Sequence, residues 1–427
     1  MSLTDGFLLS ASNPIASRDQ WQAEEIALRV LHLPAYQAAR RKAGFLWRQG
    51  YGEHASAEAL ETFEAAMDEY AFNYLLKAVA SDGDYPRLVR DFMPPHTWFG
   101  RDVPGARMGG DNPDNCYRVA GVTHGKRYEV RGKVVGRPAT SVTFTLVANY
   151  GTSVTIQTLD FADLKCAADG SFTIPIDGED AQGRANHLRT APACKFLFVR
   201  DSMNDWASET PLALSIRNLT PPTAAPLTDQ QIVERAAHRM NEDVPLYYWF
   251  TRLFSAKPVN TLAISAPSGA LGGLVTQAGA QGRLQLADDE AAVVTVDPAG
   301  AAYAGLVAHD WWFRTLEYWN HTSSLTSHAS TPDPDGRYTY VISIRDPGVH
   351  NWIDTCGRHE SLLLYRWQGL PRDQVRQGPQ VDPVRIVKLR DLTQVLPKHT
   401  VMVDRQERER QVAAREAAFR RRLIERG

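Results

Sequence analysis

The chain has 427 residues, and its 47 basic side chains nearly balance its 49 acidic ones, for a formal net charge of -2. This balance excludes a bulk electrostatic attraction to nucleic acid or to a membrane, so neither is an expected partner. The four cysteines lie far apart in the sequence, which excludes a disulfide framework and a zinc knuckle.

The N-terminal region, residues 1–95, is predicted to be helical. Asp19 is placed to cap a helix through residues 20–31, and apolar residues recur at three-to-four spacing between residues 55 and 80. That stripe is more typical of a core-facing helix than of a pocket wall. The first residues lack the basic start and apolar segment of a signal peptide, and no run approaches the roughly 20 apolar residues that span a bilayer. A cytoplasmic location is therefore expected.

Residues 96–220 are predicted to form a first β module. Short runs rich in β-branched and aromatic residues alternate there with Gly and Asp turns, which favours an antiparallel sandwich or jelly roll over a parallel sheet. Residues 221–290 are predicted to be a connector, partly helical and partly rich in Gly and Ala. Its helix is expected to begin at Asp229 and to end near Asp243.

Residues 291–400 are predicted to form a second β module, and residues 401–427 a C-terminal helix. The alternating Arg and Glu of that helix are typical of a solvated face, or of a contact that makes a homo-oligomer. The same order of strand, Arg-Asp, loop and Trp occurs twice, in FLFVRDSMNDW (196–206) and YVISIRDPGVHNW (340–352). This repetition indicates two similar β modules, unless the match is coincidental. The expected fold class is α+β: antiparallel β-sandwich or jelly-roll-like modules with an N-terminal helical region and a C-terminal helix.

The turn GGDNPDN precedes the first β module's strands and carries Asp111, Asn112 and Asp114. Carboxylate and amide oxygens on such a turn bind hard cations such as calcium, or they hydrogen-bond a hydroxylated substrate. The spacing does not match an EF-hand, and Asx-rich turns commonly serve only to cap strands. For a functional site we predict Asp111 as an orienting carboxylate, with Asn112 and Asp114 as substrate ligands.

A second polar loop, residues 345–360, joins two strand-like runs, and polar loops on rigid strands often carry binding sites. His350 and His359 are candidate acid/base groups because histidine titrates near neutral pH. Asp354 is a candidate to orient a histidine. The spacing of the two histidines matches no strong zinc motif, so no metal is expected.

Other side chains of this loop are predicted to bind the substrate. Arg345 and Arg358 are suited to hold an anionic group, although pairing with Asp346 and Glu360 is an equal alternative. Asn351 and Trp352 complete the predicted substrate contacts. Cys356 permits a thiol nucleophile, but a buried structural cysteine is the commoner case.

An aromatic segment between His309 and His321 contains Trp311, Trp312 and Trp319. Such residues form the walls of pockets for ring-bearing ligands, although core packing is the commoner reason for the cluster. We predict the three tryptophans as a wall of the substrate site.

The two loops carry a family resemblance. DNPD (111–114) and DPGVHNWIDTCG (346–357) are similar to the DNPD and DPGxxNWxDTxG segments of bacterial proteins in the domain-of-unknown-function 1214 family. The resemblance covers roughly residues 109–368, and its late motif is the more specific. It implies a β-sandwich-rich body and no settled activity.

The preferred functional prediction is a bacterial enzyme that acts on a small ring-bearing organic molecule by metal-independent acid/base chemistry, hydrolytic or lyase-like. No motif for an organic cofactor is evident. The alternatives are a non-catalytic protein that binds a carbohydrate or another small ligand, and a structural assembly subunit.

Overall fold

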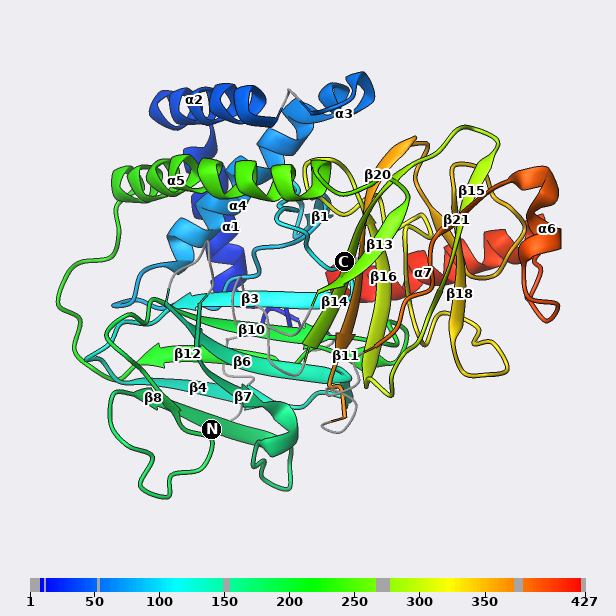
Figure 1. Cartoon of the computed structure of the whole chain (residues 1–427). Helices are drawn as coiled ribbons and strands as arrows, with labels where there is room; N and C mark the ends of the chain where they lie inside the picture. The colour runs from blue at the N-terminus through cyan, green and yellow to red at the C-terminus, as the bar shows by residue number, and fades with distance from the viewer. Residues whose placement is uncertain are drawn as a thin grey trace.

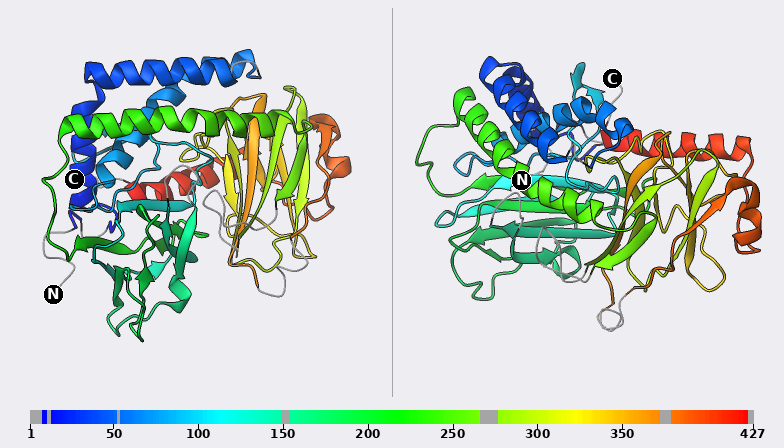
Figure 2. Two further views of the ribbon diagram at one scale, coloured as in Figure 1. Left: turned by 60° about the vertical axis from the view of Figure 1, so that its left-hand side comes forward. Right: turned by 45° about the horizontal axis from the view of Figure 1, so that its top comes forward.

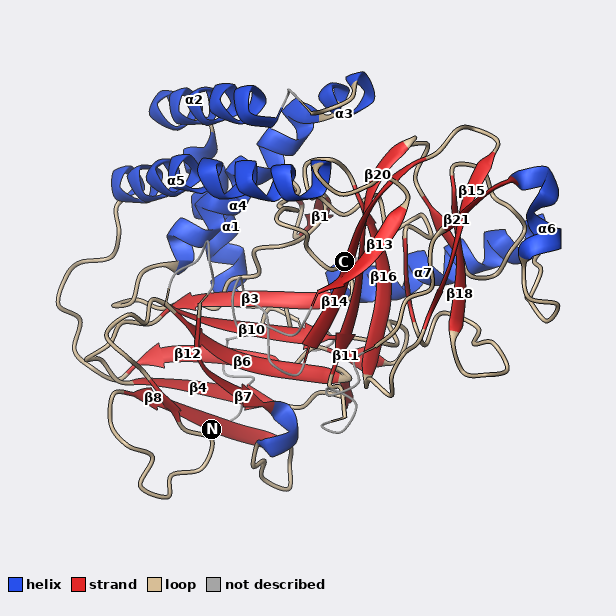
Figure 3. Cartoon of the chain, in the orientation of Figure 1, coloured by secondary structure: helices blue, strands red, loops and turns tan. Residues whose placement is uncertain are grey.

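The computed structural model describes residues 8–10, 13–51, 54–148, 154–265, 277–371 and 379–423. The chain forms an α+β fold with a helical layer, two β modules and a C-terminal helix (Figure 1 and Figure 3), which confirms the predicted fold class. Within the described ranges, no helix combines the length and the apolar character that crossing a bilayer requires.

The helical layer consists of five helices. They are α1 (Arg18–Leu31), α2 (Pro34–Tyr51), α3 (Ala57–Glu61), α4 (Phe63–Ala80) and α5 (Asp229–Ser255). Ser17, not Asp19, caps α1, because its side chain accepts from the Gln20 backbone N–H at 3.1 Å. The apolar stripe predicted between residues 55 and 80 is core: nearly every α4 side chain is buried.

Helix α5 runs past the predicted end near Asp243 and contains Pro245. Proline lacks an N–H and disfavours a helix interior, which is why the sequence indicated an earlier end. Tertiary packing overrides that local preference, since Val244, Tyr247 and Phe254 belong to the core shared with α2 and α4.

The first β module is a sandwich of two four-stranded sheets. One has the order β3 (Asn115–Gly121), β10 (Phe196–Ser202), β6 (Ser141–Val147) and β7 (Thr155–Asp160); the other has β12 (Ala213–Asn218), β4 (Tyr128–Lys133), β8 (Ser171–Asp177) and β9 (Leu188–Arg189). Phe144 and Leu197 of the first sheet share a core with Val130 and Ile174 of the second. Short pairs of strands flank the module: β1 (His96–Trp98) with β2 (Arg101–Val103), and β5 (Arg137–Pro138) with β11 (Glu209–Thr210).

The second β module also packs two sheets around one core. One has the order β13 (Thr261–Ser265), β14 (Gln277–Gln285), β20 (Glu360–Gln368), β16 (Tyr303–His309) and β17 (Ser324–Thr326); the other has β19 (Trp352–Asp354), β18 (Tyr338–Ser343), β15 (Glu290–Val296) and β21 (Arg385–Lys388). The module therefore begins before residue 291, inside the segment predicted to be a connector. A Cβ on Gly282 would lie 1.9 Å from the Thr261 carbonyl oxygen, so the glycine that hid this strand is required by close strand packing.

The C-terminal helix α7 (Arg405–Leu423) follows the short α6 (Leu392–Val395) and contacts both β modules. Ala418 and Phe419 are buried in the core of the first module. Arg408 donates to the Asp346 carboxylate at 2.9 Å in the second module, and Arg422 donates to the Pro113 carbonyl at 2.9 Å in the first. This Arg-rich helix was predicted to be solvated or to form oligomers, but part of it packs within its own chain and joins the two β modules. The homo-oligomer stays a prediction.

Candidate functional site

Strand β19 (Trp352–Asp354) divides the polar loop predicted to carry the site. His350 and Asn351 lie before the strand, and Asp354 and Cys356 lie at its end. His359 lies at the start of β20, where it contacts the helical layer. The structure therefore distributes the predicted acid/base residues over three places.

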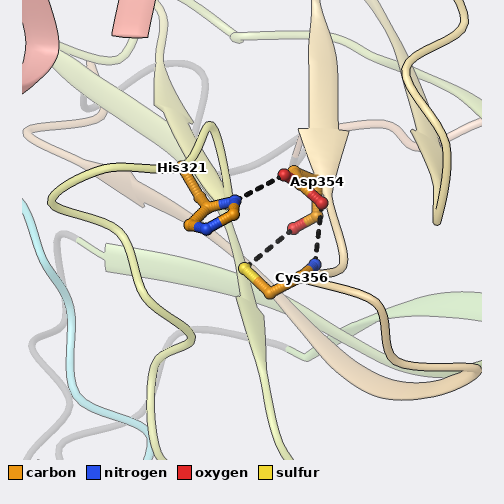
Figure 4. Close-up of side chains that lie close together, drawn as sticks. All are labelled: His321, Asp354 and Cys356. Atoms are coloured by element: carbon orange, nitrogen blue, oxygen red, sulfur yellow. Dashed lines mark hydrogen bonds and ion pairs between the residues drawn. The ribbon is translucent and has the colours of Figure 1, made fainter. Parts of the chain in front are cut away.

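The end of β19 brings Asp354 to His321 from the loop between β16 and β17 (Figure 4). With the hydrogen on Nδ1, His321 donates to Asp354 Oδ2 at 2.7 Å. The imidazole side chain is 39% exposed, whereas the carboxylate is only 11% exposed. The hydrogen bond to Asp354 raises the pKa of His321, and among the described residues Nε2 has no hydrogen-bond partner.

Cys356 occupies a tight turn directly after Asp354. The Arg358 N–H donates to the Thr355 carbonyl at 3.1 Å, and Cys356 and Gly357 have φ values of 53° and 80°, as in a type I′ turn. A left-handed conformation costs a residue with a side chain roughly 1–2 kcal/mol. Asp354 Oδ1 holds the turn by accepting the Cys356 N–H at 2.7 Å.

The Cys356 thiol is held in its protonated form. Burial raises its pKa, and the negative charges of Asp354 and Glu317 raise it further. A thiol nucleophile needs a lowered pKa and a cationic neighbourhood. The surroundings of Cys356 therefore oppose the nucleophilic interpretation.

Arg358 and Glu317 form a fixed ion pair beside this turn. The two guanidinium nitrogens lie 3.1 and 3.2 Å from the two carboxylate oxygens. Burial raises the pKa of Glu317, but the charge and hydrogen bonds of Arg358 outweigh it and lower the value to about 2. Arg358 pairs with Glu317 instead of Glu360, the partner that the sequence suggested.

His321, Asp354 and Cys356 also form a group of potential metal ligands. Their donor atoms lie within 4.8 Å of one another, and a His, Asp and Cys set suits a borderline ion such as zinc. A metal ion would have to replace the proton between His321 and Asp354 and remove the proton of a thiol that burial keeps neutral. The group fits a proton-transfer pair in its present arrangement.

His359 lies apart from this group and joins the second β module to α3. Its Nδ1 lies 3.0 Å from Glu58 Oε1 and its Nε2 lies 3.0 Å from Asp288 Oδ1. Hydrogen bonds to Glu58 and then to Asp288 raise the pKa of His359. Both ring nitrogens are engaged, so His359 serves as an ionic clasp. Arg345, 67% exposed, lies 3.7 Å from the same Asp288.

His350 and Asn351 line a small surface hollow together with Asp333, His399 and Thr400. Gln411 of α7 lies 2.8 Å from His350 Nδ1, and burial lowers the pKa of this imidazole. His399 Nε2 lies 3.1 Å from Asp333 Oδ1. Asn351 mainly serves the backbone: it donates to Thr331 and Thr339 carbonyls and accepts the Thr331 N–H.

Residues 111–115 of the GGDNPDN turn are buried, and protein groups satisfy the side chains of Asp111, Asn112 and Asp114. Asp114 accepts from Tyr303 Oη at 2.6 Å and from Trp206 Nε1 at 2.8 Å. Asn112 donates to the same tyrosine oxygen at 2.8 Å. Asp111 accepts from the Thr315 N–H and hydroxyl, and burial raises its pKa to about 6.

Two arginines of α7 extend the network around Asp114. The Arg415 and Arg422 guanidinium carbons lie 4.2 and 4.1 Å from the Trp206 ring centroid. Burial raises the pKa of Asp114, and bonds from Tyr303 and the charge of Arg415 oppose that shift. The turn therefore acts as a junction between the two modules and α7. Protein groups occupy the side-chain oxygens of Asp111, Asn112 and Asp114, whereas the buried Asn115 Oδ1 has no hydrogen-bond partner among the described residues.

The four predicted tryptophans are mostly core. Trp311 and Trp312 are 2% and 1% exposed, and Trp312 donates to the Ala59 carbonyl at 2.9 Å. Trp352 is buried and donates to the Ser343 carbonyl. Trp319 is half-buried and lies two residues before His321, so of these four it is the one that is not buried.

Sequence reasoning did not assign His321 or Glu317 to the site, although both lie in the aromatic segment that it singled out. His321 is 33 residues from Asp354, and no motif links them. The positive φ of Cys356 could not be predicted from the sequence either, because φ is a property of the folded backbone.

Comparisons with known proteins support the fold. No family model matches the chain, and no curated protein matches it. The crystal structure of an uncharacterised protein from Burkholderia cenocepacia aligns at a TM-score of 0.68 with 24% identity, over 85% of this chain and 99% of that one. The VPA0106 protein from Vibrio parahaemolyticus aligns at a TM-score of 0.38 with 10% identity, over 65% of this chain and 90% of its own. The first likeness is one of fold alone, and the resemblance to the domain-of-unknown-function 1214 family stays a prediction.

Proposed function

We propose that the protein is an enzyme that acts on a small organic molecule by proton transfer at His321. The observation that carries this proposal is the 2.7 Å bond between His321 Nδ1 and Asp354 Oδ2. A carboxylate bound to one ring nitrogen fixes the tautomer and stabilises the imidazolium, so the other nitrogen exchanges the proton with substrate. Asp354 thus keeps its predicted role as the orienting carboxylate, with His321 in place of His350 or His359.

The exposure of the two groups supports this assignment. The imidazole is 39% exposed and accessible to a substrate, while its partner carboxylate is 11% exposed and shielded from solvent. In the forward step, Nε2 of neutral His321 takes a proton from the substrate or from water. The resulting imidazolium returns the proton to the leaving group, which serves a hydrolytic or a lyase-like reaction.

The groups around His321 and Asp354 indicate which class of substrate the site would bind. Arg358 is neutralised by Glu317 through two contacts, so it is a hydrogen-bond donor more than an attractor of anions. Trp319, half-buried beside the loop, is suited to contact a ring on the substrate. These features favour a neutral or weakly acidic ring-bearing molecule with hydroxyl groups.

A binding screen followed by a turnover assay tests the proposal. Sugars, phenols and aromatic acids are screened by thermal shift, since a ligand that binds the folded state raises the melting temperature. Hits are then incubated with the protein and followed by NMR for product. His321→Gln is expected to lower kcat about a hundredfold to ten-thousandfold, the usual contribution of general acid–base catalysis.

The control is His238→Gln. His238 is another exposed histidine bound to a carboxylate, 3.1 Å from Glu242 on α5, and it lies on a different element. It should leave turnover unchanged. Turnover that survives both His321→Gln and Asp354→Asn would contradict the proposal, and turnover that a chelator abolishes and zinc restores would assign His321, Asp354 and Cys356 to a metal centre instead.

A non-catalytic ligand-binding role is the second candidate. It is favoured by the small hollow that His350 and Asn351 of the predicted loop line together with Asp333 and His399. A ligand of that hollow should shift the melting temperature of wild type and of His321→Gln equally, lose the shift in His350→Ala, and show no turnover.

A further inference from the structure

Helix α2 carries an outward face whose composition differs from the rest of the surface. Arg41, Lys42, Phe45, Leu46 and Arg48 are all exposed. Phe45 follows Arg41 by one turn and precedes Arg48 by one turn, and Leu46 follows Lys42 by one turn, so the five form one continuous face. Phe45 is 61% exposed, more than any other large apolar side chain in the described part of the chain.

The positively charged side chains of this face have no acidic partner among the described residues. Helix α2 contains no acidic residue. Arg40, on the side of the helix toward α4, pairs with Glu64 and Asp68. By contrast, the side chains of Arg41, Lys42 and Arg48 make no hydrogen bond or ion pair with any residue that the structure describes. The face therefore combines exposed apolar groups with a local positive charge, although the whole chain is slightly negative.

The position of α2 leaves this face accessible. Figure 1 and the left view of Figure 2 show α2 as the outermost helix, with α5 between it and the β modules. The inward side packs on its neighbours: Trp47 is buried and its ring centroid lies 5.0 Å from that of Tyr247 on α5. The inward side of the helix is therefore packed against the protein, whereas Arg41, Lys42, Phe45, Leu46 and Arg48 are exposed.

We propose that this outer face of α2 docks on an anionic phospholipid surface. A helix on the outside of the molecule with exposed apolar and cationic side chains suits a plane of lipid headgroups, into which Phe45 and Leu46 insert while the surrounding cations contact phosphate and carboxylate groups. Each Lys or Arg near such a surface strengthens attachment, and the attraction decays within a Debye length. The expectation of no membrane partner rested on net charge, which averages over the whole surface and hides a local patch.

Vesicle sedimentation tests the proposal with the full chain. The protein is mixed with vesicles of phosphatidylcholine alone and with vesicles of equimolar phosphatidylcholine and phosphatidylserine. It should pellet with the second and stay in solution with the first, and added salt should weaken the binding. The double variant Arg41→Glu with Lys42→Glu should lower the partition coefficient about tenfold or more, and Phe45→Ser should also weaken it.

Two control variants match these changes elsewhere on the surface. Arg421→Glu reverses an exposed charge on α7, and Leu219→Ser removes an apolar side chain that is 46% exposed on the first β module. Both should bind as wild type does. Absence of binding to the serine-lipid vesicles, equal binding by the Glu and Ser variants of α2, or binding to duplex DNA or polyglutamate without binding to vesicles would overturn the proposal.

Discussion

The two motif turns differ in how their polar groups are used. In the GGDNPDN turn, Asp114 is 1% exposed and accepts hydrogen bonds from Tyr303 and Trp206. At the end of β19, Asp354 is also buried, but its partner His321 is 39% exposed. Similar residues in the sequence therefore form a structural junction in one place and hold a solvent-accessible histidine in the other.

Asp114→Ala should produce the largest loss of stability. It leaves the Tyr303 hydroxyl and the Trp206 N–H without their acceptor and removes a carboxylate whose charge interacts with half-buried Arg415 and buried Arg422. Losing two buried bonds to a charged group costs about 3 kcal/mol or more. Urea unfolding measures the change, and Asp169→Ala, on an exposed turn of the same module, should lose less than about 1 kcal/mol.

Trp206→Phe should produce the second-largest loss of stability. The substitution keeps an aromatic ring, but it deletes the N–H that Asp114 accepts and weakens the contact with two guanidinium groups. We expect a loss of about 2 kcal/mol in urea unfolding. Trp319 is half-buried and lies outside this network, so Trp319→Phe is the control. If both substitutions cost the same free energy of unfolding, the junction contributes little to stability.

His321→Gln and Asp354→Asn should change stability by less than about 1 kcal/mol each, because one partner is partly solvated. A double-mutant cycle isolates their coupling. The two turns should therefore differ in role: substitutions in the first should lower the free energy of unfolding, and substitutions in the second should lower activity. A stability loss as large as that of Asp114→Ala would make the second turn structural as well.

Removing the ion pairs of His359 should have the smallest effect on stability, and the effect should appear in the pH dependence of the free energy of unfolding. Its pKa is raised in the folded state by Glu58 and Asp288, so its contribution is complete below the unfolded value of about 6.5 and is lost as the pH rises through the folded value. The side chain is half exposed, so less than about 1 kcal/mol is expected. His359→Gln should flatten the fall in stability above about pH 6.5, and His32→Gln, an exposed histidine at the end of α1, should not.

The order of the helical and β regions along the chain could be predicted from the amino-acid pattern alone. Apolar periodicity of two or of three to four predicts strands and helices because it reflects which face of each element is buried. It located the helical region, both β modules, the C-terminal helix and the two polar loops. Locally misleading signals caused the errors: Pro245 suggested that α5 ended early, and the Gly/Ala-rich stretch before residue 291 concealed β14.

Which polar groups meet could not be predicted in this way. Asp354 could orient any of several histidines, and the packing of β19 against the loop after β16 selected His321. Burial likewise distinguished Trp311 and Trp312, which are core, from Trp319, which is half-buried in the same segment. Such pairings depend on how distant elements pack, and local sequence patterns report each element's preference but not its neighbours.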